Sequence, residues 1–81
     1  MKWLIRKAQP MMERVISSFI DQIGYDDTTE ELFVRFKSGS TYKYDNIAED
    51  VYDEFMDAIS KGFFFNMNIK NNILYPYEQV S

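Results

Sequence analysis

Apolar and polar residues alternate through two neighbouring segments of the chain, residues 32–37 and 41–45. Alternation is typical of strands that bury one face, because successive side chains point to opposite sides of a sheet. A third segment, residues 17–26, nearly alternates and ends in residues that favour turns. Its Ile20 and Ile23 cannot share one face of a regular strand, so we expect a β-bulge or a late strand start between them. The three segments predict a three-stranded antiparallel meander.

Ser38-Gly39 separates the second strand from the third, and the length of this loop decides which face carries Tyr42 and Tyr44. A two-residue loop pairs Tyr42 with Arg35 and places both tyrosines on the exposed face. A three-residue loop, with its glycine in the left-handed conformation of a bulge, pairs Tyr42 with Val34 instead. We favour the three-residue loop because it gathers the apolar side chains of both strands on one face.

A helical repeat follows the three strands. Asn46 and Glu49 have the spacing of an N-cap and its acidic partner, so a helix is expected to start there. Ser60 and Gly62 interrupt this helix, and residues 63–71 are expected to form a second, shorter one. The tail, residues 73–77, is expected to be extended and to close over the core. The apolar stripe of the first helix consists of Ile47, Val51, Tyr52, Phe55, Met56 and Ile59.

The fold class that this order of elements predicts is α+β, with two helices packed on one face of the meander. Residues 1–14 form an N-terminal basic extension, and residues 15–81 form a single domain. The extension contains Lys2, Arg6, Lys7 and Arg14 against Glu13 alone. Either its apolar residues pack on the domain or on another copy, or the segment contacts nucleic acid or a membrane surface.

The opposite face of the first helix is acidic and carries Glu49, Asp50, Asp53, Glu54 and Asp57. Like charges four residues apart on a helix repel each other by roughly 0.2–0.5 kcal/mol per pair. No Lys or Arg lies between Ile47 and Ile59 to relieve this repulsion. The face either keeps the protein in solution or docks on a basic surface of a partner protein.

Composition excludes most chemistry. The chain has 81 residues without Cys or His, so disulfides, the common zinc sites and the usual catalytic bases and thiols are missing. Its three glycines are isolated and build no phosphate-binding loop. We therefore expect no enzyme, no metal and no cofactor. No apolar run is long enough to span a membrane, so we expect a cytoplasmic protein without a membrane-spanning segment.

A series of motifs follows in one order between Val15 and Tyr77, and it includes Ser17-Ser18, Ile23-Gly24-Tyr25-Asp26, Gly39, Tyr42, Tyr44, Val51-Tyr52, Ser60, Gly62 and Phe64-Phe65-Asn66. This order resembles the KTSC domain family, which is named for the C-terminus of some lysyl-tRNA synthetases. The family usually has Val-Pro where this chain has Ile47-Ala48. It is also found as a free-standing bacterial or phage protein, and we expect that version here.

The resemblance implies a module of unknown activity for which RNA binding is the leading hypothesis. The net charge of −4 means that RNA binding would need a local basic face. The residues that can provide it on the exposed sheet face are Phe33, Arg35, Lys37 and Lys43. There an aromatic ring could stack on a base beside cations that bind phosphates. The same residues are also typical of a solvent-facing strand that discourages edge pairing. The alternative hypothesis is a protein-binding or inhibitory module of phage origin that docks through the acidic helix.

Overall fold

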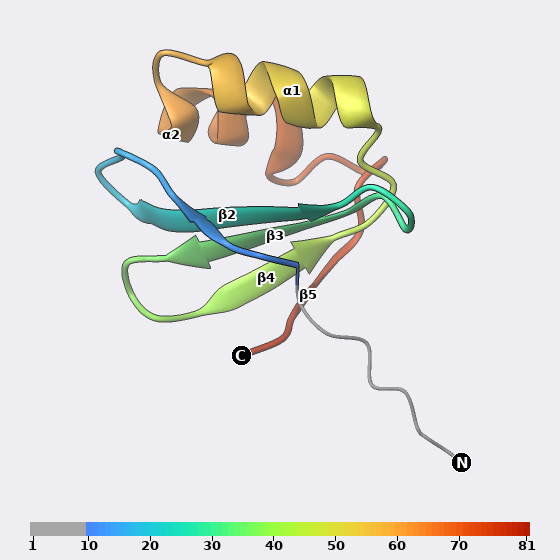
Figure 1. Ribbon diagram of the computed structural model, residues 1–81, viewed down its shortest axis with the longest axis horizontal. Coiled ribbons are helices and arrows are strands. Elements are labelled where there is room, and N and C mark those ends of the chain that lie inside the picture. The colour runs from blue at the N-terminus through green and yellow to red at the C-terminus, as the bar shows by residue number, and fades with distance from the viewer. Residues whose placement is uncertain (1–9) are drawn as a thin grey trace.

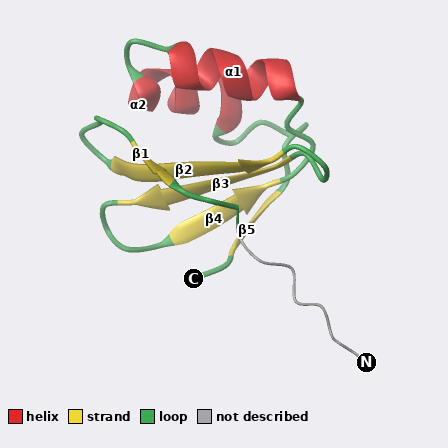
Figure 2. Ribbon diagram, in the orientation of Figure 1, coloured by secondary structure: helices red, strands yellow, loops and turns green. Residues whose placement is uncertain are grey.

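The computed structural model describes residues 10–81 as an antiparallel sheet with helices over one of its faces (Figure 1). The sheet contains five strands in chain order, drawn as yellow arrows in Figure 2. They are β1 (Glu13–Arg14), β2 (Ile20–Asp26), β3 (Glu31–Phe36), β4 (Thr41–Tyr44) and β5 (Tyr77–Gln79). The α+β class and the three central strands are confirmed. The two short edge strands were not predicted.

Each edge strand pairs with a strand whose own alternation of apolar and polar residues is clear. Glu13 of β1 pairs with Ile23 of β2, so the sheet extends into the segment that the sequence assigns to the extension. Tyr77 of β5 pairs with Tyr44 of β4. Strands of two or three residues are too short for a hydrophobic repeat, and their formation depends on the neighbouring strand rather than on their own residues.

The expected β-bulge in the first central strand is present. The register between β2 and β3 shifts between Ile20 and Gln22. The bulge inserts one extra residue into β2 and so shifts the alternation of its side chains. Ile20 and Ile23 therefore both face the core, and both are 0% exposed.

The hairpin between β3 and β4 closes in the three-residue form, and Tyr42 pairs with Val34 as favoured. Gly39 has φ +105°, a conformation that residues with a Cβ rarely adopt, and its amide donates to the carbonyl of Phe36 at 2.9 Å. This register places Tyr42 and Tyr44 on the side of the sheet that faces the helices.

Helix α1 (Glu49–Asp57) begins later than the sequence predicts. Asn46 is not its N-cap, because this residue has φ +66° and lies in the preceding turn. The amide of Ile47 donates to the carbonyl of Glu30 at 2.9 Å, which holds Ile47 in the loop before the helix. Ile47 is still fully buried, so a contact with another part of the chain replaces the expected first turn.

The second helical segment consists of α2 (Lys61–Phe64) and a continuous π-helical turn, η1 (Phe65–Ile69). It starts before residue 63 because the hydroxyl of Ser60 accepts a hydrogen bond from the amide of Phe63 at 3.2 Å. Helix α1 ends at Asp57, and Ile59 is therefore exposed instead of completing the apolar stripe.

The core lies between the sheet and the helices. Phe65 and Ile69 share one buried face of η1, as expected. In the tail, Tyr75 packs against the core, whereas Ile73 and Leu74 are exposed and do not close over it. The buried core residues are Ile20, Ile23, Leu32, Val34, Tyr44, Ile47, Phe55, Phe65 and Ile69.

Candidate binding cleft

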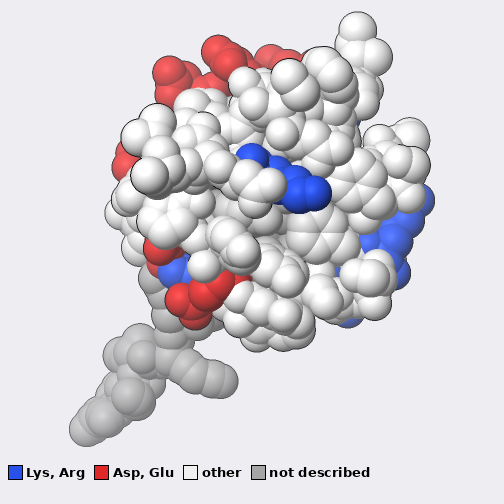
Figure 3. Space-filling model, turned by 180° about the vertical axis from the view of Figure 1, so that it is seen from behind, with Lys and Arg blue, Asp and Glu red and all other residues white. Residues whose placement is uncertain are grey.

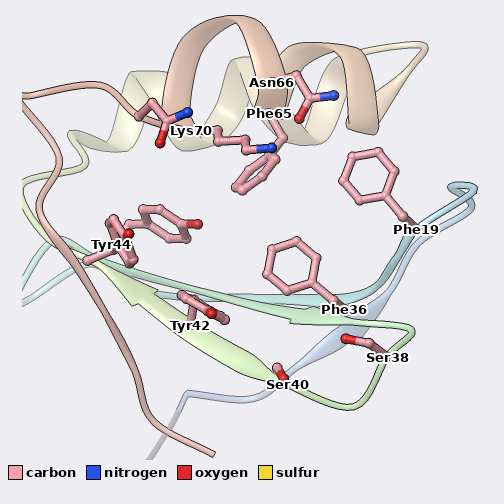
Figure 4. A pocket seen from close by; sticks show the side chains of 11 residues that line it. Phe19, Phe36, Ser38, Ser40, Tyr42, Tyr44, Phe65, Asn66 and Lys70 are labelled. Carbon is pink, nitrogen blue, oxygen red and sulfur yellow. The ribbon is translucent and has the colours of Figure 1, made fainter.

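A cleft of about 360 Å³ opens between η1 and the β4 side of the sheet (Figure 4). Figure 4 shows Phe65, Asn66 and Lys70 entering from the helical side, and Tyr42 and Tyr44 from the strand below. The sequence did not single out this cleft. Its lining residues are Phe19, Phe36, Ser38, Ser40, Tyr42, Tyr44, Phe65, Asn66, Lys70, Asn71 and Tyr77.

Aromatic rings that pack on one another form the walls of the cleft. The ring centroid of Phe36 lies 5.7 Å from that of Tyr42 and 5.5 Å from that of Phe65. Tyr44 meets Phe65 edge to face, with the centroids 5.6 Å apart. Tyr77 lies 5.7 Å from both Tyr42 and Tyr44. These contacts hold the rings in place before any ligand arrives.

Tyr44 contributes a polar group to this aromatic site. The residue is 4% exposed, and its hydroxyl forms no hydrogen bond with any described residue. Within residues 10–81 no fully enclosed side-chain oxygen or nitrogen is unpaired, so this hydroxyl reaches the open space of the cleft. Burial, with smaller contributions from Tyr42 and Tyr77, raises the pKa of Tyr44 to about 12. The phenol is therefore protonated and able to donate at neutral pH.

The helical wall presents Asn66 and Lys70, whose side chains are exposed and have no polar partner among the described residues. In contrast, the side-chain amide of Asn68 donates to the carbonyl of Phe64 at 3.1 Å and so bonds to its own helix. The amide of Lys70 donates to the carbonyl of Phe65 at 2.8 Å, which closes the π-helical turn. Such turns are rare and occur frequently at functional sites.

The outer face of the sheet does not present Phe33 as predicted. Phe33 is only 5% exposed and pairs across the strands with Gly24. A Cβ on Gly24 would lie within 3.2 Å of atoms of residues 10, 11 and 12, so this segment crosses over the strand pair. Burial of this face by the N-terminal segment makes the Phe33 ring unavailable for stacking on a base, which corrects the expectation.

Two carboxylates already neutralise Lys43 on the same face. Its Nζ lies 3.2 Å from Glu31 Oε2 and 2.8 Å from Asp45 Oδ1, and the side chain is 18% exposed. The hydrogen bond that Lys43 donates to Asp45 is the main cause of the raised pKa of Lys43. Of the four residues predicted for RNA binding, only Arg35 and Lys37 are exposed.

The acidic face of α1 lies where the sequence predicts it. Figure 3 shows acidic side chains gathered along the top of the molecule, where α1 lies. Among residues 10–81, no Lys or Arg forms an ion pair with any of these carboxylates. The five residues, all exposed, are Glu49, Asp50, Asp53, Glu54 and Asp57.

A model of the KTSC domain matches residues 16–75 of this chain. The chain belongs to the KTSC domain family. A KTSC domain protein of Yersinia pestis, known from its crystal structure, superposes with a TM-score of 0.81 at 35% identity. The superposition covers 88% of this chain and 97% of the Yersinia protein. The family expected from the sequence is therefore confirmed.

Relatives of this KTSC domain occur in two settings. The lysine–tRNA ligase of Trichormus variabilis is 41% identical over 64 residues, which are 79% of this chain but only 11% of the ligase. A protein of Tsukamurella paurometabola is 39% identical over 59 residues, which are 73% of this chain and 88% of that protein. A KTSC domain thus forms a small part of a ligase in one case and most of a short protein in the other.

The cleft belongs almost entirely to the KTSC segment, because only Tyr77 among its lining residues lies outside residues 16–75. Across residues 10–81 no helix is long and apolar enough to cross a membrane. In the same range no three acidic side chains converge in a way that could hold a metal ion. The proposed contacts of residues 1–9 lie outside the described residues.

Proposed function

We propose that this KTSC domain is a non-enzymatic module that binds single-stranded RNA through the cleft between η1 and the sheet. The observation that carries the proposal is the cleft itself, where aromatic rings, an unpaired hydroxyl and a cation meet. Proteins bind single-stranded RNA by stacking unpaired bases on aromatic side chains and by placing cations near the phosphates. The ligase relatives act, by their printed name, on tRNA, which supports RNA as the ligand.

The charge distribution favours the cleft over the outer face of the sheet. Lys70 stands at the cleft without a carboxylate partner among the described residues, whereas Lys43 on the outer face has two. A cation that is already neutralised gains less from a phosphate, because binding must first break its ion pairs. The outer face retains Arg35 and Lys37, and it is the rival location for RNA.

Reversal of one charge at each location distinguishes the two surfaces. We expect Lys70→Glu to weaken binding of labelled single-stranded RNA by roughly tenfold. The slope of the logarithm of affinity against the logarithm of salt concentration should become shallower by about one, as expected for the loss of one phosphate contact. Arg35→Glu should leave the affinity within about twofold, although it changes the net charge by the same amount. Fluorescence anisotropy at two salt concentrations measures both effects.

The outcomes of this titration have different meanings. Loss of binding with Arg35→Glu alone would move the RNA site to the outer face. No binding of the unaltered protein even at low salt would remove the RNA function and leave the second candidate.

The second candidate function is docking on a basic partner protein through α1. It is favoured by the five carboxylates on one exposed helix face, which have no Lys or Arg partner among residues 10–81 and cost stability as like-charge pairs. Complementary charge speeds association and selects the partner.

A double charge reversal tests this docking. We expect Asp50→Lys with Asp53→Lys to lose a protein partner that the unaltered domain retains in a pull-down at low salt. Asp27→Lys with Glu30→Lys adds the same charge in the β2–β3 turn and should retain it. Both Asp50 and Asp53 are exposed, so the loss would not come from unfolding. Equal capture by both double variants would contradict docking through α1.

A further inference from the structure

The hydroxyl of Tyr44 has no role in holding the fold together. The ring packs against Phe65 and Tyr77, yet the hydroxyl has no hydrogen-bond partner among the described residues. This hydroxyl reaches the open space of the cleft, where water or a bound molecule can form a hydrogen bond with it. Phenylalanine would fill the same space and keep the ring contacts. The hydroxyl is therefore available to a molecule that enters the cleft.

The opposite wall offers groups of matching chemistry. Asn66 presents an amide that can both donate and accept, and Lys70 presents a positive charge. A molecule between the walls would meet rings along its faces, hydrogen-bonding groups at its edge and a cation near the opening. A flat, polar-edged ring that carries an anionic group satisfies all three.

The size of the cleft limits the ligand to one such unit. Its volume of about 360 Å³ lies near the lower end of the roughly 300–1,000 Å³ range of small-molecule sites. An aromatic side chain of a peptide would fit the walls, but phenylalanine has no polar edge for Tyr44 and no charge for Lys70. A nucleotide has both.

We infer that the cleft holds one unstacked nucleotide, with its base against Phe36 and Tyr42, the base edge bonded to the Tyr44 hydroxyl, and its phosphate at Lys70. This inference rests on the proposed function and deepens it by naming the unit of RNA that enters the cleft. The rest of the strand then runs outside the cleft, along the surface of the domain.

The test uses uridine monophosphate as the probe and follows the backbone amide signals of the isotope-labelled full chain by NMR. We expect saturable shifts at Phe36, Tyr42, Asn66 and Lys70. Uridine without phosphate and ribose phosphate without a base should each bind at least about threefold more weakly, because each lacks one of the two recognised parts. Tyr44→Phe should weaken uridine monophosphate by about fivefold through loss of one hydrogen bond.

A matched control removes a different tyrosine hydroxyl. Tyr25 lies on β2 outside the cleft, and its hydroxyl donates to the carbonyl of Ile47 at 2.6 Å. Tyr25→Phe should therefore bind uridine monophosphate as well as the unaltered protein does. Because the Tyr44 hydroxyl has no described protein partner, Tyr44→Phe should keep the spectrum of a folded domain.

Two results would overturn the inference: no saturable shifts at the cleft, or equal affinity of Tyr44→Phe and the unaltered protein. Neither result decides whether RNA binds elsewhere on the domain, which the anisotropy titration measures separately. Shifts at the cleft without any affinity for single-stranded RNA would support the nucleotide site and refute the RNA function.

Discussion

Replacement of Phe65 with Ala is expected to lower the free energy of unfolding by about 3–5 kcal/mol. Phe65 is 2% exposed, and its ring lies against four others, those of Phe19, Phe36, Tyr44 and Phe55. These rings come from the β1–β2 loop, two strands and α1, so one side chain joins the sheet to both helical segments. Its removal leaves a cavity that none of the rigid neighbouring rings can fill.

The effect is large relative to the stability of a small domain. At about 0.05–0.15 kcal/mol per residue, a chain of this length is stable by roughly 4–12 kcal/mol in total. Phe63→Ala is the matched control, because Phe63 lies two residues away and is 67% exposed. That variant should change the free energy of unfolding by less than about 0.5 kcal/mol. Urea unfolding followed by circular dichroism compares the two, and similar losses would show that Phe65 is not central to the core.

Stability is expected to fall at alkaline pH, between pH 10 and about 12. Burial raises the pKa of Tyr44 to about 12 in the folded state, and burial with nearby Glu30 and Glu49 does the same for Tyr25. In the unfolded chain both phenols titrate near their ordinary pKa of 10.0. The unfolded state therefore loses protons first. The contribution of the two phenols to the free energy of unfolding is fully present below pH 10 and decreases as the pH rises toward 12.

The expected loss from Tyr44 is at most about 2–3 kcal/mol, since each unit of pKa difference corresponds to about 1.4 kcal/mol. Water that reaches the hydroxyl from the cleft makes the loss smaller than this limit. Urea unfolding at neutral pH and at steps above pH 10 measures it, with phenolate absorbance as the second readout. Tyr44→Phe removes one of the raised groups and should lose less stability over this range. A free energy of unfolding that is constant up to pH 11 would contradict burial of these phenols.

The central part of the fold could be predicted from the sequence because its signals are local. Alternation placed β3 and β4, and the spacing of Ile20 and Ile23 predicted a β-bulge or a late strand start, of which the bulge is present. Gly39 allowed the three-residue turn, and the apolar pattern of the two strands selected the register. Each of these features depends on residues within one hairpin.

Features that depend on a distant segment were missed or placed wrongly. Asn46 has the chemistry of an N-cap, but the backbone amide of Ile47 donates a hydrogen bond to the carbonyl of Glu30, and the helix begins only at Glu49. Phe33 occupies an outward position in the strand, yet residues 10–12 cross over that face and bury it. Neither interaction leaves a pattern in the local sequence.

The candidate site divides in the same way. The favoured hairpin register placed Tyr42 and Tyr44 on the apolar face of the sheet, and both line the cleft. Asn66 stood out only as part of the motif Phe64-Phe65-Asn66, and Lys70 did not stand out. The π-helical turn is what brings both residues to the cleft that Tyr42 and Tyr44 line. The acidic face of α1 was predictable in full, since all of its residues lie on one helix.

The sequence by itself therefore determined the family, the α+β class, the central hairpin register and the acidic helix face. The class, the register and the acidic face follow from short-range periodicity, and the family follows from an order of motifs that resembles it. The tertiary structure alone decided the edge strands, the burial of Phe33, the neutralisation of Lys43 and the cleft. Those features arise where segments far apart in the chain meet, and the free energy of such contacts depends on their three-dimensional arrangement rather than on the neighbouring residues in the chain.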